Sequence, residues 1–203
     1  MMEQVRKAVS NIVSTFLMIV QHIPVVGPWY GIMTIPIIIY FLTVLLVHPE
    51  FISSELSLLF FSWHFIFGRT MFLAGLTIFL LALSNFRKRT TPISTYGLYS
   101  KIRHPQYLGL TIVTLGFTLM SIEWKGTIEL LGVWLISLIG YILLAYSEEK
   151  HLLKNHHKLY KQYMEQTHFM LPIDPPKNLP EPLFTVLFML SIASICSLIV
   201  TII

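Results

Sequence analysis

Residues 103–109 read Arg-His-Pro-Gln-Tyr-Leu-Gly and lie between a basic segment and a long apolar run. Proline has no backbone N–H and a preset φ, so Pro105 predicts the first turn of a helix, with His104 as its cap. The first-turn amides of such a helix have no partner inside it and attract an anion. Arg103 adds a planar guanidinium suited to a carboxylate or phosphate. The heptapeptide therefore predicts the mouth of a membrane helix with room for an anionic group.

Two more of its residues extend this ligand surface. Tyr107 offers a ring and a hydroxyl one turn into the helix. Gly109 has no side chain, which lets a flat ligand approach the backbone. On the heptapeptide alone, the alternative stays open that these residues are interfacial anchors and helix-packing positions.

The composition is that of an integral membrane protein. Of 203 residues, 55% are hydrophobic and only 12% are charged, and the mean hydropathy is +0.71. The single cysteine, Cys196, excludes an internal disulfide and a thiolate metal site. His151, His156 and His157 do not share one helical face, so we predict no metal. The basic residues cluster beside apolar runs, so a net charge of +4 does not indicate nucleic acid.

The positions of the charges set the number and orientation of the membrane spans. The segment between residues 87 and 103 is rich in Lys and Arg, which places it in the cytoplasm. We predict that residues 9–26 lie at the interface, because a sixth span there would move Arg6 and Lys7 to the outside. The fold class is therefore all-α, with about five transmembrane helices and a cytoplasmic amphipathic helix. The predicted spans are 29–47, 57–84, 108–122, 127–147 and 183–203.

A tight turn at residues 123–126 makes the third and fourth spans an antiparallel hairpin. Residues 103–109 are therefore expected to face residues 146–149. An amphipathic helix is predicted at residues 148–164, with lysines that anchor it to an anionic leaflet. This divides the chain into membrane helices (1–86), a cofactor-binding catalytic region (87–182) and a last membrane helix (183–203).

Glu148 and Glu149 are adjacent carboxylates at the cytoplasmic end of the fourth span. Neither has a Lys or Arg three or four positions further on, where helical ion pairs form. Their counter-charge comes either from a bound cation or from the basic loop across the hairpin. Two solvated interfacial acids are the remaining alternative. A zwitterion satisfies both halves of the site, with its carboxylate on Arg103 and its ammonium on Glu148. S-adenosylmethionine is such a molecule.

The order of these residues is similar to that of a known group of enzymes. It runs Gly97-x-Tyr99-x-x-x-Arg103-His104-Pro105-x-Tyr107-x-Gly109, then Glu148-Glu149-x-x-Leu152, then Tyr160-x-x-Tyr163 and Pro172. Over about residues 87–172 it resembles the isoprenylcysteine carboxyl methyltransferase family and the related membrane phospholipid methyltransferases.

The resemblance implies an integral, multi-pass membrane methyltransferase that uses S-adenosylmethionine in a pocket facing the cytoplasm. A lipophilic acceptor reaches the methyl group from the bilayer, among membrane lipids, and no oligomeric state is predicted. In such enzymes the first glutamate of the pair, here Glu148, binds the amino-acid end of the cofactor, and we count Glu148 and Arg103 as the catalytic residues. Together with the residue-based assignments above, the expected cofactor-binding residues are Thr91, Pro92, Ile93, Ser94, Tyr99, His104, Pro105, Gln106, Tyr107, Gly109, Glu148 and Glu149.

The helical turn before the glutamate pair departs from the isoprenylcysteine pattern. Those enzymes tend to carry a basic residue there to hold the substrate carboxylate, whereas this chain reads Leu-Leu-Ala-Tyr-Ser at residues 143–147. Arg103 or Arg87 would have to substitute. The acceptor class stays open between an isoprenylcysteine-like carboxylate, a lipid and another apolar small molecule.

Two other functions remain alternatives. Sterol reductases, which use NADPH, show a similar Arg-His-Pro-x-Tyr-x-Gly, although this chain is short for that group. A non-enzymatic membrane protein is the other, and it leaves the glutamate pair unexplained.

Overall fold

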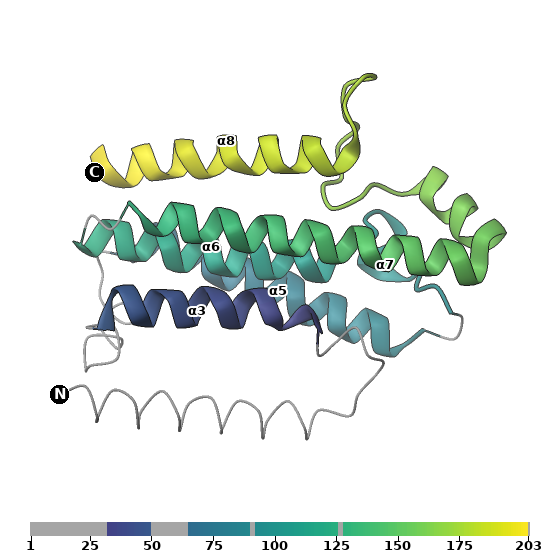
Figure 1. Cartoon of the computed structure of the whole chain (residues 1–203), viewed down its shortest axis with the longest axis horizontal. Coiled ribbons are helices and arrows are strands. Elements are labelled where there is room, and N and C mark those ends of the chain that lie inside the picture. The colour runs from purple at the N-terminus through teal and green to yellow at the C-terminus, as the bar shows by residue number, and fades with distance from the viewer. Residues whose placement is uncertain (1–31, 50–64, 90–91, 126–127, 203) are drawn as a thin grey trace.

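The computed structural model describes residues 32–49, 65–89, 92–125 and 128–202, which form a bundle of long helices (Figure 1). Four of them are long and apolar enough to cross a membrane, and α3, with 13 residues, is shorter. The described part of the chain contains no strand, only an isolated bridge between Ile102 and His168. The helices are α3 (Ile35–Val47), α5 (Ile66–Arg87), η3 (Gly97–Ser100), α6 (Pro105–Lys125), α7 (Leu130–Gln166) and α8 (Glu181–Ile202).

These helices confirm the predicted fold class, an all-α integral membrane protein. The spans predicted at 108–122 and 183–203 correspond to α6 and α8, each slightly longer than expected. The spans predicted at 29–47 and 57–84 correspond to α3 and α5, and the residues before 32 and from 50 to 64 lie outside the described ranges. The interfacial segment predicted at 9–26 also lies outside them.

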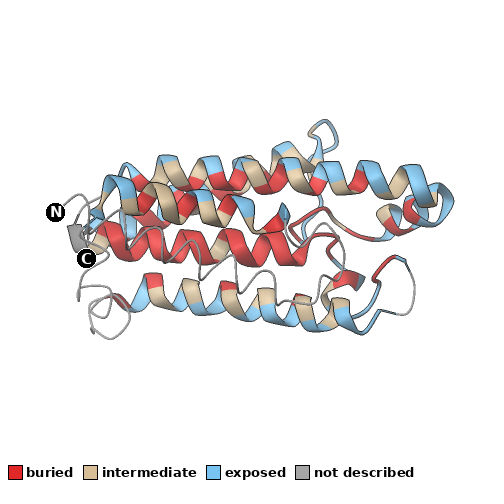
Figure 2. Ribbon diagram, turned by 60° about the horizontal axis from the view of Figure 1, so that its bottom comes forward, coloured by how far each residue is buried: buried red, intermediate tan, exposed pale blue. Residues whose placement is uncertain are grey.

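Helix α6 is the centre of the bundle. In the apolar stretch of this helix that is long enough to cross a membrane, 94% of the residues are buried (Figure 2). The helix contacts α3, α5, α7 and α8. The helix nevertheless carries buried hydroxyl groups at Thr111, Thr114, Thr118 and Ser121, and each donates to the carbonyl four residues earlier. Because their hydrogen bonds are satisfied within the helix, these side chains are compatible with the interior.

Glycines bring α5 and α6 into backbone contact. A Cβ on Gly75 would lie 2.5 Å from the backbone N of Val113, and a Cβ on Gly109 would lie 2.7 Å from that of Phe79. Gly68 and Gly116 form a second such pair two turns along. Small residues allow this close approach between membrane helices. In the structure α5 fills the space beside Gly109, which explains the missing side chain by helix packing, and the assignment of Gly109 to the cofactor stays a prediction.

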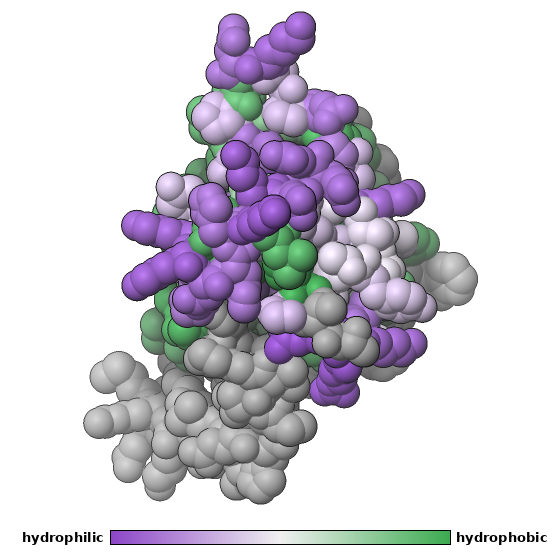
Figure 3. Space-filling view, turned by 90° about the vertical axis from the view of Figure 1, so that its right-hand side faces the viewer, coloured by the Kyte–Doolittle hydropathy of each residue, from purple (hydrophilic) through white to green (hydrophobic). Residues whose placement is uncertain are grey.

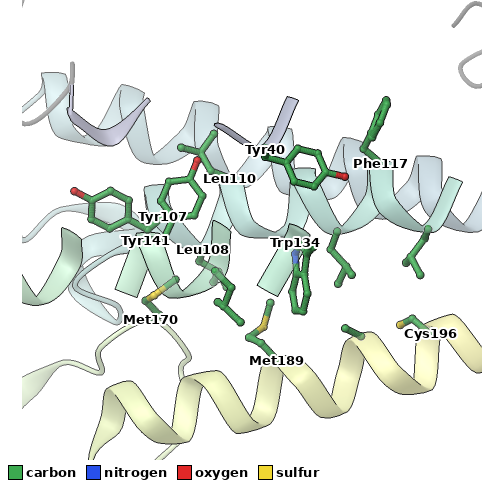
Figure 4. Close-up of a cluster of buried hydrophobic side chains, with 14 of the residues drawn as sticks. Tyr40, Tyr107, Leu108, Leu110, Phe117, Trp134, Tyr141, Met170, Met189 and Cys196 are labelled. Atoms are coloured by element: carbon green, nitrogen blue, oxygen red, sulfur yellow. The ribbon is translucent and has the colours of Figure 1, made fainter. Parts of the chain in front are cut away.

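The remaining helices pack on α6 through large side chains. Trp134 of α7 is fully buried and donates from Nε1 to the carbonyl of Thr111 at 3.1 Å. Tyr40 of α3 is hydrogen-bonded to Thr118 at 2.6 Å. Met189 and Cys196 of α8 complete this core on the opposite side of Trp134 (Figure 4). The polar tips of buried aromatics thus tie α3 and α7 to the central helix.

Helix α7 extends well beyond the length of a membrane span. We predicted a change of element between residues 147 and 148, but the helix continues through both glutamates. The break lies instead at His156, whose φ of −137° and ψ of 43° are not helical. The segment after this bend turns back toward the bundle (Figure 1). The uninterrupted helix keeps the glutamate pair in register with the membrane part of α7.

Candidate functional site

The predicted site residues gather at one end of the bundle, where α6 and α8 begin and α7 extends beyond the span. This end carries many hydrophilic side chains around a small central apolar surface (Figure 3). As predicted from the hairpin, the start of α6 faces the glutamate pair of α7, because Tyr107 and Arg103 contact Glu148 and Glu149.

A short backbone pairing fixes the residues just before α6. The N–H of Arg103 donates to the carbonyl of His168 at 2.8 Å, and the N–H of His104 donates to that of Phe169 at 3.1 Å. The carbonyl of His104 then accepts the first helical hydrogen bond, from the N–H of Leu108 at 3.2 Å. Pro105 begins the helix as predicted. Both Arg103 and His104 are buried here, so neither is a solvent-exposed interfacial anchor.

Arg103, which lies two residues before α6, contacts both α7 and α8. Its Nε donates to Oε1 of Glu149 on α7 at 2.6 Å, and one terminal nitrogen donates to Glu181, the first residue of α8. The other terminal nitrogen donates to the carbonyls of Met164 and Thr167. Burial lowers the pKa of Arg103, but the two carboxylates outweigh it and hold the pKa above its usual value. The guanidinium is thus charged and largely used by the protein itself.

Glu149 is the buried member of the glutamate pair. Its Oε1 also lies 3.3 Å from Nε2 of His104. Burial raises the pKa of this carboxyl, but the hydrogen bond and charge of His104 and the charge of Arg103 outweigh it, so the pKa lies below its usual value. Glu149 is therefore ionised and belongs to the internal ion pair.

Glu148 differs from its neighbour. Its side chain is 15% exposed, and its Oε2 accepts from the hydroxyl of Tyr107 at 3.1 Å and lies 3.7 Å from Nδ1 of His104. Both contacts are to Oε2, so Oε1 has no hydrogen-bond partner among the residues that the structure describes. Glu148 has no Arg or Lys partner in that part of the chain. It is the carboxylate with capacity for a ligand.

A second group of hydrogen bonds braces η3 against α6 and α7. The hydroxyl of Tyr99 donates to Oε1 of Gln106, and the hydroxyl of Tyr163 donates to the carbonyl of Tyr99 at 2.7 Å. η3 begins at Gly97, whose positive φ of 62° is a conformation that glycine tolerates. Tyr99 and Gln106, both predicted at the cofactor, thus lie at the site and bond to each other.

The loop before η3 packs against the returning part of α7. Ile93 is buried against Tyr160 and Tyr163, whereas Pro92 is exposed. Ser94 and Tyr160 are both buried, and the hydroxyl of each has no hydrogen-bond partner among the described residues. Thr91, the first residue of this predicted cofactor loop, lies outside the described ranges.

Three partners of Arg103 were not predicted from the sequence. Glu181 is 78 residues away, and Met164 and Thr167 contribute only their backbone carbonyls. For Glu181 the sequence offers one signal. It is an acidic residue two positions before Leu183, where the uncharged predicted span begins. Within the described residues, no three His, Cys, Asp or Glu side chains are placed to hold a metal ion.

One of three comparisons with known proteins gives a match. A family model described as phospholipid methyltransferase matches residues 56–159, just over half of the chain. The match includes α5, the loop before α6, α6 itself and α7 as far as Leu159, with the glutamate pair. No curated protein and no solved structure matches the chain.

Proposed function

Because that family model covers half of its length, the chain belongs to the phospholipid methyltransferase family and is a membrane methyltransferase, and we propose that S-adenosylmethionine is its methyl donor. Residues 87–182 form the cofactor-binding region, with Glu181 pairing to Arg103 at its end. The segments 1–86 and 183–203 supply the supporting membrane helices. The acceptor is a lipophilic molecule that enters from the bilayer.

The charge of the site supports a cationic cofactor. Three carboxylates, Glu148, Glu149 and Glu181, meet Arg103 and the imidazole of His104 among the described contacts, so the carboxylates outnumber the positive charges even with His104 protonated. S-adenosylmethionine carries an ammonium, a sulfonium and one carboxylate, so its net charge is positive. NADPH carries a pyrophosphate and a further phosphate, and several negative charges beside surplus carboxylates are unfavourable. This surplus of negative charge is the observation that carries the proposal.

Glu148 is the residue that binds the cofactor's ammonium group. Its Oε1 has no hydrogen-bond partner in the described ranges, and its Oε2 is oriented by the hydroxyl of Tyr107. Arg103 has a different role from the one that we first assigned to it. Since Glu149 and Glu181 already occupy its guanidinium, Arg103 holds α7 and α8 in position rather than binding the cofactor's carboxylate.

The ion pairs of Arg103 also restrict the chemical class of the methyl acceptor. A carboxylate acceptor needs a cation, and the buried cation at the site, Arg103, is already paired. We therefore favour a lipid acceptor over an isoprenylcysteine-like carboxylate. Leu143 and Tyr146 are exposed on α7 just before Glu148, so an acyl chain can lie along them while the reacting group enters the site.

When bound, the cofactor supplies an electrophilic methyl group on a positively charged sulfur, which becomes a neutral thioether after transfer. The protein's part is to align the methyl carbon with the acceptor and to keep water away. Glu148 fixes the amino-acid end of the cofactor. The buried ring of Tyr107 and the buried His104 line the approach to that carboxylate.

We propose that the site faces the cytoplasm. Arg87, Lys88, Arg89 and Lys101 are all exposed at this end of the bundle, and basic loops remain on the cytoplasmic side of a membrane.

Calorimetry on the detergent-solubilised protein tests the cofactor. We expect S-adenosylmethionine and S-adenosylhomocysteine to bind and NADPH not to bind. Binding of NADPH alone would favour the reductase, and no binding of any of the three would favour a non-enzymatic protein. Incubating membranes with methyl-labelled cofactor and identifying the labelled product then determines the acceptor.

A further inference from the structure

The hydroxyl groups of Tyr160 and Ser94 are buried at this end of the bundle, and neither has a hydrogen-bond partner among the described residues. We infer that the hydroxyls of Tyr160 and Ser94 form a neutral subsite that binds the nucleoside part of the cofactor. The inference rests on the proposed function and extends it to a part of the ligand that neither Glu148 nor Arg103 can recognise.

The first argument is the energetic cost of these groups. A buried hydroxyl without a partner loses its hydrogen bonds to water and gains nothing in return. The hydroxyls of Tyr99, Tyr107 and Tyr163 at the same site are all bonded to protein atoms. The side chain of Tyr160 is 1% exposed and its hydroxyl has no partner among the described residues. Phenylalanine would pack as well at this position without that cost.

The second argument is that the structure holds Tyr160 firmly in place. The bend at His156 turns the end of α7 back toward the bundle, and Ile93 of the loop before η3 packs against this segment. The hydroxyl of Tyr163 then anchors this segment on the carbonyl of Tyr99, and the ring of Tyr163 lies 5.8 Å from that of Tyr160. The Met164 carbonyl anchors it again, on Arg103. An unpartnered group in a well-anchored segment is not explained by loose packing.

The third argument brings Ser94 to the same place from the opposite side. Ile93 is buried against the rings of Tyr160 and Tyr163, so the loop that carries Ser94 packs on the returning helix. The hydroxyl of Ser94 is buried and also lacks a partner in the described part of the chain. Two elements that are far apart in sequence thus each contribute one unsatisfied hydroxyl beside one apolar cluster.

The chemistry of the two hydroxyls indicates which part of the cofactor they bind. Hydroxyls both donate and accept hydrogen bonds, and they carry no charge. Ribose hydroxyls and purine nitrogens offer matching donors and acceptors, and an aromatic side chain suits a flat base. The amino-acid end of the cofactor instead needs charged partners, which Glu148 provides. The two ends of the cofactor are therefore recognised by different residues on α7.

The variant Tyr160→Phe, which removes only the hydroxyl, gives a test with two readouts of opposite sign. We expect its affinity for S-adenosylhomocysteine to fall about three- to tenfold, the usual worth of an uncharged hydrogen bond. Its melting temperature without ligand should stay level or rise, because an unsatisfied buried group has been removed. The matched control is Tyr163→Phe, which should melt lower because its hydroxyl bonds the carbonyl of Tyr99. Unchanged affinity of Tyr160→Phe would overturn the inference.

A second comparison separates the nucleoside from the amino-acid end. 5′-Methylthioadenosine keeps the nucleoside and lacks the ammonium and carboxylate. The affinities of both ligands are measured by competition. Tyr160→Phe and Ser94→Ala should weaken the binding of both 5′-methylthioadenosine and S-adenosylhomocysteine, whereas Glu148→Gln should weaken the binding of S-adenosylhomocysteine alone. Ser137→Ala is the control for Ser94→Ala, because the buried hydroxyl of Ser137 also has no partner among the residues that the structure describes, and its removal should change neither affinity.

These outcomes are separable from failure of the proposed function. If wild-type protein does not bind S-adenosylhomocysteine, the proposed function fails and the inference fails with it. If wild-type protein binds it but Tyr160→Phe loses affinity only for S-adenosylhomocysteine, the hydroxyl contacts the amino-acid end and our assignment is wrong. Failure of 5′-methylthioadenosine to compete at millimolar concentration would also contradict a nucleoside subsite.

Discussion

Replacing Glu149 by glutamine removes the charge that balances the buried guanidinium of Arg103. Removing one member of a buried ion pair costs about 3–5 kcal/mol. Glu181 still contacts Arg103 in the variant, and its side chain is 31% exposed, so we take the lower end, about 3 kcal/mol. At about 2–4 °C per kcal/mol for a chain of this size, the melting temperature should fall by roughly 6–12 °C.

The neighbouring substitution Glu148→Gln is the matched control, because it makes the same chemical change one residue earlier. Glu148 has no Arg or Lys partner in the described ranges, so its replacement should leave the melting temperature nearly unchanged. It should instead weaken the binding of S-adenosylmethionine roughly 10- to 150-fold, because a hydrogen bond to a charged group contributes about 1.5–3 kcal/mol. Thermal unfolding in detergent and calorimetry measure the two effects. The assignment of Glu149 to stability and of Glu148 to binding would be refuted by equal melting temperatures of Glu149→Gln and wild-type protein. A large loss of stability in Glu148→Gln would refute it as well.

Three further measurements test other parts of the structure. Because the pKa of Glu149 lies below its ordinary value of 4.5, its charge stabilises the fold at neutral pH and this contribution is lost as pH falls below about 4.5 through the folded-state pKa. Melting temperatures between pH 7 and pH 3 should therefore fall more steeply for wild-type protein than for Glu149→Gln, and parallel curves would contradict this. Gly109→Ala should cost about 1–3 kcal/mol because its Cβ meets the backbone of α5, whereas Gly132→Ala, with open space around it, should melt like wild-type protein. A cysteine introduced by Lys101→Cys should react with an impermeant reagent only after the membrane is opened. Labelling in intact cells would contradict the proposed cytoplasmic orientation of the site.

Much of the fold follows from composition and charge alone. Uncharged runs of about 20 residues predict spans, and a short turn between two of them predicts a hairpin, as found for α6 and α7. The end of the α7 span was harder to locate, because the change to an amphipathic pattern after Ser147 does not require the helix to stop. The actual break at His156 has no proline or glycine to mark it.

The site was predictable where its residues are close along the chain or across the hairpin. The juxtaposition of Arg103 with the glutamate pair followed from the hairpin. Which acid pairs with Arg103 did not follow, because the choice depends on side-chain direction around α7. The role of Gly109 was also ambiguous, since a missing side chain fits a ligand and a neighbouring helix equally well. Backbone acceptors such as Thr167 carry no signal in the residue type.

The contact between Arg103 and Glu181 also bears on how the chain is made. Synthesis proceeds from the N-terminus, so α6 and the glutamates of α7 leave the ribosome before the residue that begins α8. Until then the guanidinium lacks one of its two carboxylates, and a chain halted before residue 181 would keep that deficit permanently. Release of the final helix therefore completes the contacts of the buried guanidinium at this end of the bundle, and a truncated product lacks the tie between Arg103 and α8.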